Sequence, residues 1–322
     1  MGFTTWSFGP NPEDKTETYN FIANNSDIYI EHPDDKIPWQ AWINNTELPV
    51  EFTDMINGTV SDKISNIDLC VSLGLLNMDR SDLAEDFDGT IPQYNSMDDK
   101  KIEDAYFKHV DYILGKLNPK YLVICIEANE LKLHSKVKWE QYKNLIKNVK
   151  LRVKEKYPDL KISESITLHN IYNPETENPE AYTNEMINYM NNMDFASISF
   201  KGMQTKNDFQ KAFDLINSRI NVPIAFVETC HLAENLNIKS LDLHIKSSEK
   251  KQNKYMETLL TNAQEHNYEF IIWWSYRDFD ALWETFPEEV KDLGKIWRNT
   301  GILDKNGKKR ASKYTWDIVF KK

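Results

Sequence analysis

The sequence predicts an α/β protein, and specifically a single-domain (β/α)8 TIM barrel that spans residues 1–322. Short apolar segments alternate with longer amphipathic ones eight times along the chain. The apolar segments are almost continuous in hydrophobic residues, which is typical of strands that a parallel sheet buries on both faces. The length of 322 residues suits one barrel with insertions, because such a barrel needs about 250 residues.

The eight apolar segments are the expected strands, and the amphipathic segments between them are the expected helices. The strands are expected at residues 2–8, 27–32, 68–76, 121–128, 161–169, 195–200, 223–229 and 270–276. The helices are expected at residues 17–24, 51–65, 98–117, 139–157, 179–192, 206–219, 249–266 and 287–298. No glycine-rich phosphate-binding turn follows any strand, so the pattern favours a closed barrel over an open nucleotide-binding sheet. Two long loops, at residues 77–99 and 231–248, follow strands and are expected on the active face.

Composition limits the partners that this chain can bind. Its formal net charge is −11, with no compensating basic stripe, so neither nucleic acid nor an anionic membrane is an expected partner. No segment approaches the roughly 18–20 apolar residues of a membrane span. The cysteines, Cys70, Cys125 and Cys230, lie in or beside apolar segments and are expected to be buried reduced thiols. Without clustered Cys/His spacings, we expect no metal and no cofactor.

A neutral ligand such as a carbohydrate suits this charge best. The oligomeric state is unknown from the sequence. The location is also open, between secretion with a trimmed leader and the cytoplasm.

The active face of a barrel is built at the carboxyl ends of its strands. The residues that stand there are polar, acidic and aromatic at once, a mixture that suits sugars: indole rings stack on pyranose faces, and carboxylates, amides and arginine bind hydroxyl groups. In strand order they are Trp6; Glu31 and His32; Asn77, Asp79 and Arg80; Glu127, Asn129 and Glu130; His169 and Asn170; Phe200 and Lys201; Glu228 and His231; and Trp273, Trp274, Tyr276 and Arg277.

Cleavage of a glycosidic bond requires two carboxyl groups, one that donates a proton and one that is ionised. Glu130 and Glu228 are the candidate pair, because each is the last acidic group on its strand. The alternative is that either glutamate forms a structural ion pair with Arg80 or Arg277.

These residues resemble the retaining clan A glycoside hydrolases, with Asn129-Glu130 ending strand four, Glu228 ending strand seven and a tryptophan on strand eight. The layout is also loosely similar to that of family 53 endo-β-1,4-galactanases. The resemblance implies that Glu130 is the acid/base and Glu228 the nucleophile, with carboxyl groups about 5–5.5 Å apart. It further implies that Asn129 binds the sugar 2-hydroxyl, and that Trp273 or Trp274 forms the floor of the subsite.

The sequence departs from that family near the end of strand six, where many members have a tyrosine that orients the nucleophile. Residues 199–201 are Ser-Phe-Lys here, so His231, Tyr276 and Arg277 are the candidates to take its place. Glu127 would face away from Glu130 by strict strand alternation, unless the strand bulges there.

Several other side chains are candidate sugar contacts, each with a structural alternative. His32 and His169 suit either substrate contact or a buried structural role, and Arg80 with Asp79 suits either substrate or a loop-fixing ion pair. Trp39 and Trp42 suit a distal sugar platform or loop packing.

Two alternatives to a glycosidase remain open. A metal-dependent hydrolase would need His-x-His on strand one, where the chain has Thr4 and Thr5. A non-catalytic carbohydrate-binding barrel is compatible with the missing tyrosine.

Overall fold

The structure is a computed structural model that describes residues 1–33, 35–205 and 209–321. These residues form two compact units, one made of residues 1–30 and 198–322 and the other of residues 31–197. The chain passes between the units within two strands, β2 (Ile28–Glu31) and β7 (Ala196–Lys201). Whether the chain acts as the single domain that the sequence predicts stays a prediction.

In the first unit, the sheet contains β1 (Gly2–Thr4), β8 (Ile224–Cys230) and β11 (Phe270–Trp273), in the order β2-β1-β11-β8-β7. β11 pairs in parallel with both β1 and β8. The aliphatic and aromatic residues of these strands are almost all buried, so both faces of the sheet are covered, as expected for parallel strands.

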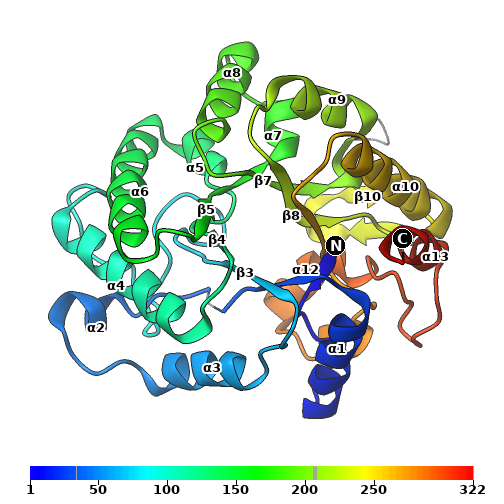
Figure 1. Ribbon diagram of the computed structural model, residues 1–322, viewed down its shortest axis with the longest axis horizontal. Coiled ribbons are helices and arrows are strands. Elements are labelled where there is room, and N and C mark those ends of the chain that lie inside the picture. Colours follow the sequence, from blue (N-terminus) through cyan, green and yellow to red (C-terminus); the bar gives the residue numbers. More distant parts are fainter. Residues whose placement is uncertain (34, 206–208, 322) are drawn as a thin grey trace. The chain divides into compact units, whose positions relative to one another are not determined.

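Helices follow the strands of the first unit (Figure 1). Next to β1 lies α1 (Pro12–Asn25), and α10 (Glu249–Glu265) packs against both α9 (Phe209–Arg219) and α13 (Ala311–Phe320). After β11 come α11 (Asp280–Trp283) and α12 (Glu288–Arg298). The loop after β8 contains a small hairpin of β9 (Leu236–Ile238) and β10 (Leu243–Ile245). The short η2 (Lys239–Leu241) connects these two strands.

In the second unit, β3 (Asp68–Ser72), β4 (Tyr121–Val123) and β5 (Lys161–Ser163) pair in parallel. The long helices α4 (Lys100–Leu117) and α6 (Lys136–Lys156) lie side by side (Figure 1). The remaining elements are α2 (Trp39–Asn44), α3 (Val50–Ser61), α5 (Asn129–His134), β6 (Ser165–Thr167), α7 (Leu168–Tyr172) and α8 (Pro179–Met190).

The alternation of strand and helix in both units confirms the predicted (β/α)8 barrel class. Several predicted bounds are wrong. The fourth strand ends at Val123 rather than at residue 128, and the fifth is divided at Glu164 into β5 and β6. The short helices α2, α5 and α7 and the terminal α13 were not expected. The expected helix 206–219 begins outside the described residues, and α9 is observed from Phe209.

Trp39 packs into the second unit with no exposed surface, and its indole donates to the Ala84 carbonyl at 2.8 Å. It therefore has the packing role rather than the platform role. In the part of the chain that is described, no helix combines the length and the apolar character needed to cross a membrane.

Candidate active site

Glu228 lies on β8 at an irregularity of the strand pairing. Phe226 is paired with Ile271 of β11, but the next pair joins Thr229 to Trp273, so β8 has one extra residue between the two pairs. A β-bulge of this kind redirects side chains and is common beside active sites. Thr229 points toward α9 and α10, because its hydroxyl donates to the Phe200 carbonyl at 2.7 Å and lies against Tyr255. Its neighbour Glu228 therefore lies on the opposite face of β8.

Lys201 ends β7 and forms an ion pair with Glu228, at 3.4 Å between Nζ and Oε1. Its side chain is 15 % exposed and that of Glu228 is 13 % exposed, so water screens the pair only in part. The ammonium group also lies over the Trp297 ring of α12, 5.5 Å from its centroid. The Lys201 ammonium thus contacts both the Glu228 carboxylate and an aromatic ring.

An aromatic cluster lies on the first unit around Trp274. The ring centroid of Trp274 is 5.5 Å from that of Trp6. The Trp6 centroid is in turn 5.8 Å from that of Phe279 and 6.5 Å from that of Phe286. Trp274 is half-buried and Trp6 is 38 % exposed, so indole surface remains open to solvent. A partly exposed pair of indoles can stack against the C–H face of a sugar ring.

Trp273, the other expected sugar contact on this strand, is buried without exposed surface. Its indole nitrogen donates to the Thr300 carbonyl at 2.9 Å, and its ring lies 6.0 Å from that of Tyr255 on α10. The prediction for Trp273 is therefore wrong in this structure, because the side chain packs between β11 and a helix. Trp274 is the strand-eight tryptophan that remains available.

The three residues expected to replace the missing tyrosine lie elsewhere. Arg277 pairs with Glu17 of α1 at 3.1 Å and lies over the Phe8 ring, and Tyr276 stacks on Phe21 of the same helix. His231 is 1 % exposed and packs against Tyr255. All three assignments are corrected by these positions, and Lys201 is a residue near the end of strand six that does contact Glu228.

Burial lowers the pKa of His231 to about 4, so the imidazole is neutral at pH 7. Its Nδ1 lies 2.9 Å from the Leu232 carbonyl. The ring is therefore a neutral part of the packing behind β8.

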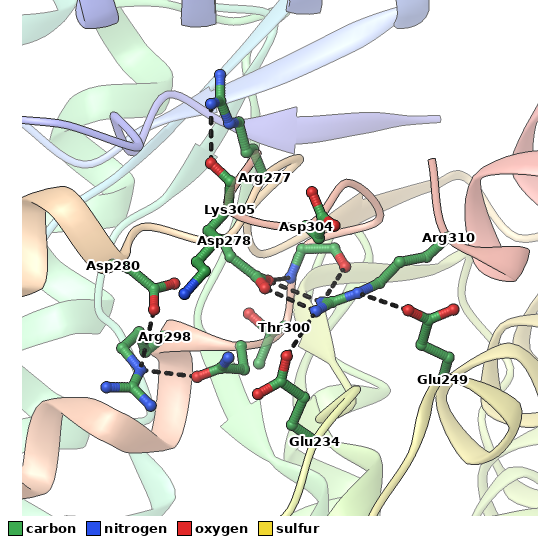
Figure 2. A network of polar contacts seen from close by, with 12 residues as sticks. Glu234, Glu249, Arg277, Asp278, Asp280, Arg298, Thr300, Asp304, Lys305 and Arg310 are labelled. Carbon is green, nitrogen blue, oxygen red and sulfur yellow. Dashed lines mark hydrogen bonds and ion pairs between the residues drawn. The ribbon is translucent and has the colours of Figure 1, made fainter. Parts of the chain in front are cut away.

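The loops that follow β8 and β11 are joined by a polar network around Arg310 (Figure 2). Arg310 is 2 % exposed and pairs with Asp278 at 2.7 Å, Glu234 at 3.2 Å and Glu249 at 3.5 Å. Burial raises the pKa of Asp278 to about 7, an effect that the adjacent guanidinium opposes. We expect the network to fix both loops on the first unit.

Glu130 lies in the second unit on the first turn of α5, rather than at the end of a strand. The side chain is half-buried, and its Oε1 accepts a hydrogen bond of 2.8 Å from the Thr167 hydroxyl at the end of β6. Tyr182 of α8 lies near this carboxyl group, and burial raises the pKa of its phenol well above the usual value. Two neutral hydroxyl groups, those of Thr167 and Tyr182, are therefore among the neighbours of Glu130.

Asn129 is fully buried and holds Thr167 in place. Its Oδ1 accepts from the Thr167 backbone N–H at 2.8 Å, and its Nδ2 donates to the Thr167 carbonyl at 3.3 Å and to the Tyr182 hydroxyl at 3.1 Å. The implied contact of Asn129 with a sugar hydroxyl is therefore corrected, because the amide is enclosed by protein. It supports Glu130 indirectly, through Thr167.

Glu127 lies in the turn between β4 and α5, where it pairs with Arg80. Both Nε and Nη2 of Arg80 donate to Oε2 of Glu127, at 3.3 and 3.1 Å. Both residues have a left-handed backbone, with φ of +51° for Glu127 and +59° for Arg80. Elsewhere in the described chain, the non-glycine residues with positive φ are all Asn or Asp, which tolerate this region. Such strain is concentrated at functional sites in proteins.

The remaining predicted contacts are Asp79, His32 and His169. Asp79 is exposed and accepts from the Ser81 backbone and hydroxyl, so it does not pair with Arg80. His32 is half-buried after β2. His169 lies on α7 rather than at a strand end, and burial lowers its pKa.

Sequence reasoning missed Thr167 and the pairing of Lys201 with Glu228. Lys201 was expected at the end of strand six but was given no role there, although a cation next to a strand-end glutamate is itself a signal. Thr167 was placed inside a longer strand. The position of Glu127 depends on a left-handed turn that nothing in an apolar segment indicates.

Comparison with known proteins identifies the fold class. No protein-family model matches the sequence, and no curated protein matches it. Many solved structures are similar. One is a GH5_18 protein from Bifidobacterium longum subsp. longum in complex with Manb1-4GlcNAc, with a TM-score of 0.68 and 12 % identity over 97 % of this chain and 73 % of that one.

Two further similar structures have the same class of fold. The GH53 catalytic domain of Ignisphaera aggregans has a TM-score of 0.63 and 17 % identity, over 94 % of this chain and 87 % of that one. An exo-beta-1,4-mannosidase from Opitutaceae bacterium strain TAV5 has a TM-score of 0.66 and 10 % identity, over 99 % of this chain and 58 % of that one. At these identities the likeness establishes the (β/α)8 barrel fold that these glycoside hydrolases share, and the resemblance noted from the sequence is confirmed at that level.

Proposed function

We propose that this protein is a glycoside hydrolase that cleaves β-linked oligo- or polysaccharides with retention of configuration. The observation that carries the proposal is the contrast between its two candidate glutamates. Glu228 is next to the Lys201 ammonium, whereas Glu130 accepts a bond from the neutral Thr167 hydroxyl. A cation favours an ionised nucleophile, and a hydrogen bond from a neutral hydroxyl group leaves a carboxyl group able to gain and lose a proton.

In the proposed mechanism, a Glu228 carboxylate oxygen attacks the anomeric carbon while Glu130 protonates the departing glycosidic oxygen. Glu130 then removes a proton from water, which displaces Glu228 and restores the starting configuration. Trp274 and Trp6 would stack against the sugar. The similar structures support this class of activity, because they are named as GH5_18, GH53 and mannosidase proteins.

The test is a screen of β-linked aryl glycosides and oligosaccharides with the wild-type protein and Glu130→Ala. We expect turnover by the wild type, with the β-anomer formed first. Glu130→Ala should be slow on poor leaving groups and should recover activity with azide, giving a β-glycosyl azide from the glycosyl-enzyme. An α-anomer as the first product would contradict the retaining mechanism.

A non-catalytic carbohydrate-binding barrel is the second candidate. The enclosure of Asn129 and Trp273 favours it, since both were expected to contact sugar. It predicts that the wild type and Glu228→Gln bind an oligosaccharide equally well and that neither releases product. If that result held across the whole screen, the hydrolase proposal would fail.

A further inference from the structure

We propose that Lys201 is the positioning residue for Glu228, and that its ammonium group keeps this carboxylate ionised and oriented for reaction. The consequence for catalysis depends on the proposed function. The ion pair itself does not.

The geometry that supports this role lies within the first unit. Lys201 is the last residue of β7 and Glu228 lies at the bulge of β8, the neighbouring strand. Phe200, the residue before Lys201, points toward α9 and α10, where its ring is 6.0 Å from Phe213 and 5.9 Å from Tyr255. Strand alternation therefore places Lys201 on the other face, together with Glu228.

The length of the contact suits a nucleophile. Charge-assisted N–H···O bonds are usually about 2.7–2.9 Å long. At 3.4 Å, Lys201 is close enough to stabilise the negative charge by Coulomb attraction. At that distance it does not bind the reacting oxygen tightly, so the oxygen lone pair stays available for attack.

Two groups beside the pair, Cys230 and Trp297, are uncharged. Burial raises the pKa of Cys230, which follows on β8, to about 12, so its thiol stays neutral at pH 7. Trp297 presents a ring face to the Lys201 ammonium, which limits the directions that the side chain can take. Lys201 is therefore a charged partner that favours the ionised form of Glu228.

A lysine acts differently from a neutral hydroxyl donor at this place. A hydroxyl group orients a carboxylate, whereas an ammonium group also favours its charged form. When Glu228 bonds to the anomeric carbon, its negative charge disappears and Lys201 loses its counter-charge. The charge returns when water cleaves the ester, so Lys201 favours the step that regenerates the enzyme.

The experiment measures the titration of Glu228 in the free protein. Glutamate labelled with 13C at the side-chain carboxyl is followed by NMR from pH 3 to 8, and Glu228→Gln identifies the signal. We expect Lys201→Met to move the titration midpoint of Glu228 upward by about one pH unit, a tenfold change in the protonation constant. Lys201→Arg should keep the wild-type midpoint within a few tenths of a unit. The acid limb of the kcat/KM profile should move in parallel.

Lys291→Met is the matched control. Lys291 also pairs with a glutamate, Glu284 at 3.2 Å, and lies over an indole, Trp283, at 4.9 Å, with a similar exposed fraction of 18 %. It should leave both the Glu228 midpoint and the acid limb unchanged.

An unchanged Glu228 midpoint in Lys201→Met would overturn the proposal, as would an equal change in the control. If Lys201→Met does not fold, Lys201→Gln provides the same comparison. A shifted midpoint in a protein that hydrolyses no glycoside would support the ion-pair role and contradict the proposed function, so the two failures are distinguishable.

Discussion

The chain leaves β4 and β8 in different ways, and the two glutamates acquire different neighbours as a result. After β4 it turns through the left-handed Glu127 into α5, so that Glu130 lies on a helical turn beside the Thr167 hydroxyl. At β8 the strand continues through Glu228 to Cys230, and the carboxylate meets Lys201 on the adjacent strand. Backbone geometry thus places a neutral hydroxyl group against one carboxyl group and a cation against the other. We propose that this difference separates the proton donor from the nucleophile.

Removal of Glu228 should have the largest effect. Glu228→Ala should lower kcat by about 10⁵-fold or more, because nothing then bonds to the anomeric carbon. Azide can occupy the space and attack the substrate directly, so the rescued product should be an α-glycosyl azide. Chiral product analysis by NMR checks this, with Glu130→Ala as the comparison that gives the β-product. The same anomer from both variants would remove the distinction between the two glutamates.

The second prediction tests which carboxylate after β4 handles the proton. We expect Glu130→Gln to lower kcat by about 10²–10⁴-fold for poor leaving groups and to have less effect on activated aryl glycosides. Glu127→Gln should lower kcat less and should show no dependence on the leaving group, because Glu127 is committed to Arg80. The measurement is kcat against leaving-group pKa for both variants.

Glu103→Gln is the control for that series, as Glu103 is also paired and nearly buried, with Lys100 at 2.6 Å. The slope of kcat against leaving-group pKa for Glu103→Gln should match that of the wild type. A steep leaving-group dependence in Glu127→Gln, together with a flat one in Glu130→Gln, would transfer the acid/base role to Glu127. The strained backbone at Glu127 and Arg80 would then have a catalytic explanation.

The amino-acid pattern predicts the fold better than it predicts the site. Eight apolar segments are enough to indicate the barrel, because burial on both sheet faces demands continuous hydrophobic residues. The end of β4 could not be predicted from them. Ile124 and Ile126 continue the apolar run, and the Ile124 amide still donates to the Ser163 carbonyl of β5 at 2.8 Å, but the chain turns over residues 126–128.

The distinction between Trp273 and Trp274 illustrates the same limit. Two adjacent tryptophans cannot be told apart by residue type. Because side chains alternate along a strand, only one of them can lie on the face that sugar could reach. Which of the two tryptophans faces which side depends on how β11 pairs with β8, and this pairing joins residues far apart in sequence. Lys201 likewise acquires its meaning from its contact with Glu228, and no spacing along the chain reveals it.

The third prediction concerns His231, which is buried directly after β8. His231 has a folded-state pKa of about 4, below its unfolded value, so the unfolded chain takes up a proton first as the pH falls. Stability is therefore complete above about pH 6.5 and declines toward pH 4. We expect the wild type to lose about 2 kcal/mol of unfolding free energy from this group between pH 7 and pH 5.

Urea unfolding at the two pH values measures that loss. His231→Phe should remove it, and the Leu232 carbonyl would keep its bond from the Ser247 hydroxyl at 2.6 Å. The exposed His266 gives the control variant His266→Asn, which should preserve the wild-type decline. An equal decline in His231→Phe would mean that the imidazole is not held neutral by the packing behind β8.

The smallest effect is expected at the aromatic cluster, and it separates the two strand-eight tryptophans. Trp274→Ala should raise KM about tenfold, a loss of about 1.4 kcal/mol that suits one sugar–indole stacking contact, with little change in kcat. Trp273→Phe should instead lower the unfolding free energy and leave KM unchanged, because its indole bonds to the Thr300 carbonyl inside the protein. Steady-state kinetics and urea unfolding of both variants measure these changes in KM and in unfolding free energy. If Trp273→Phe changed KM and Trp274→Ala did not, the faces assigned to these two residues of β11 would be reversed.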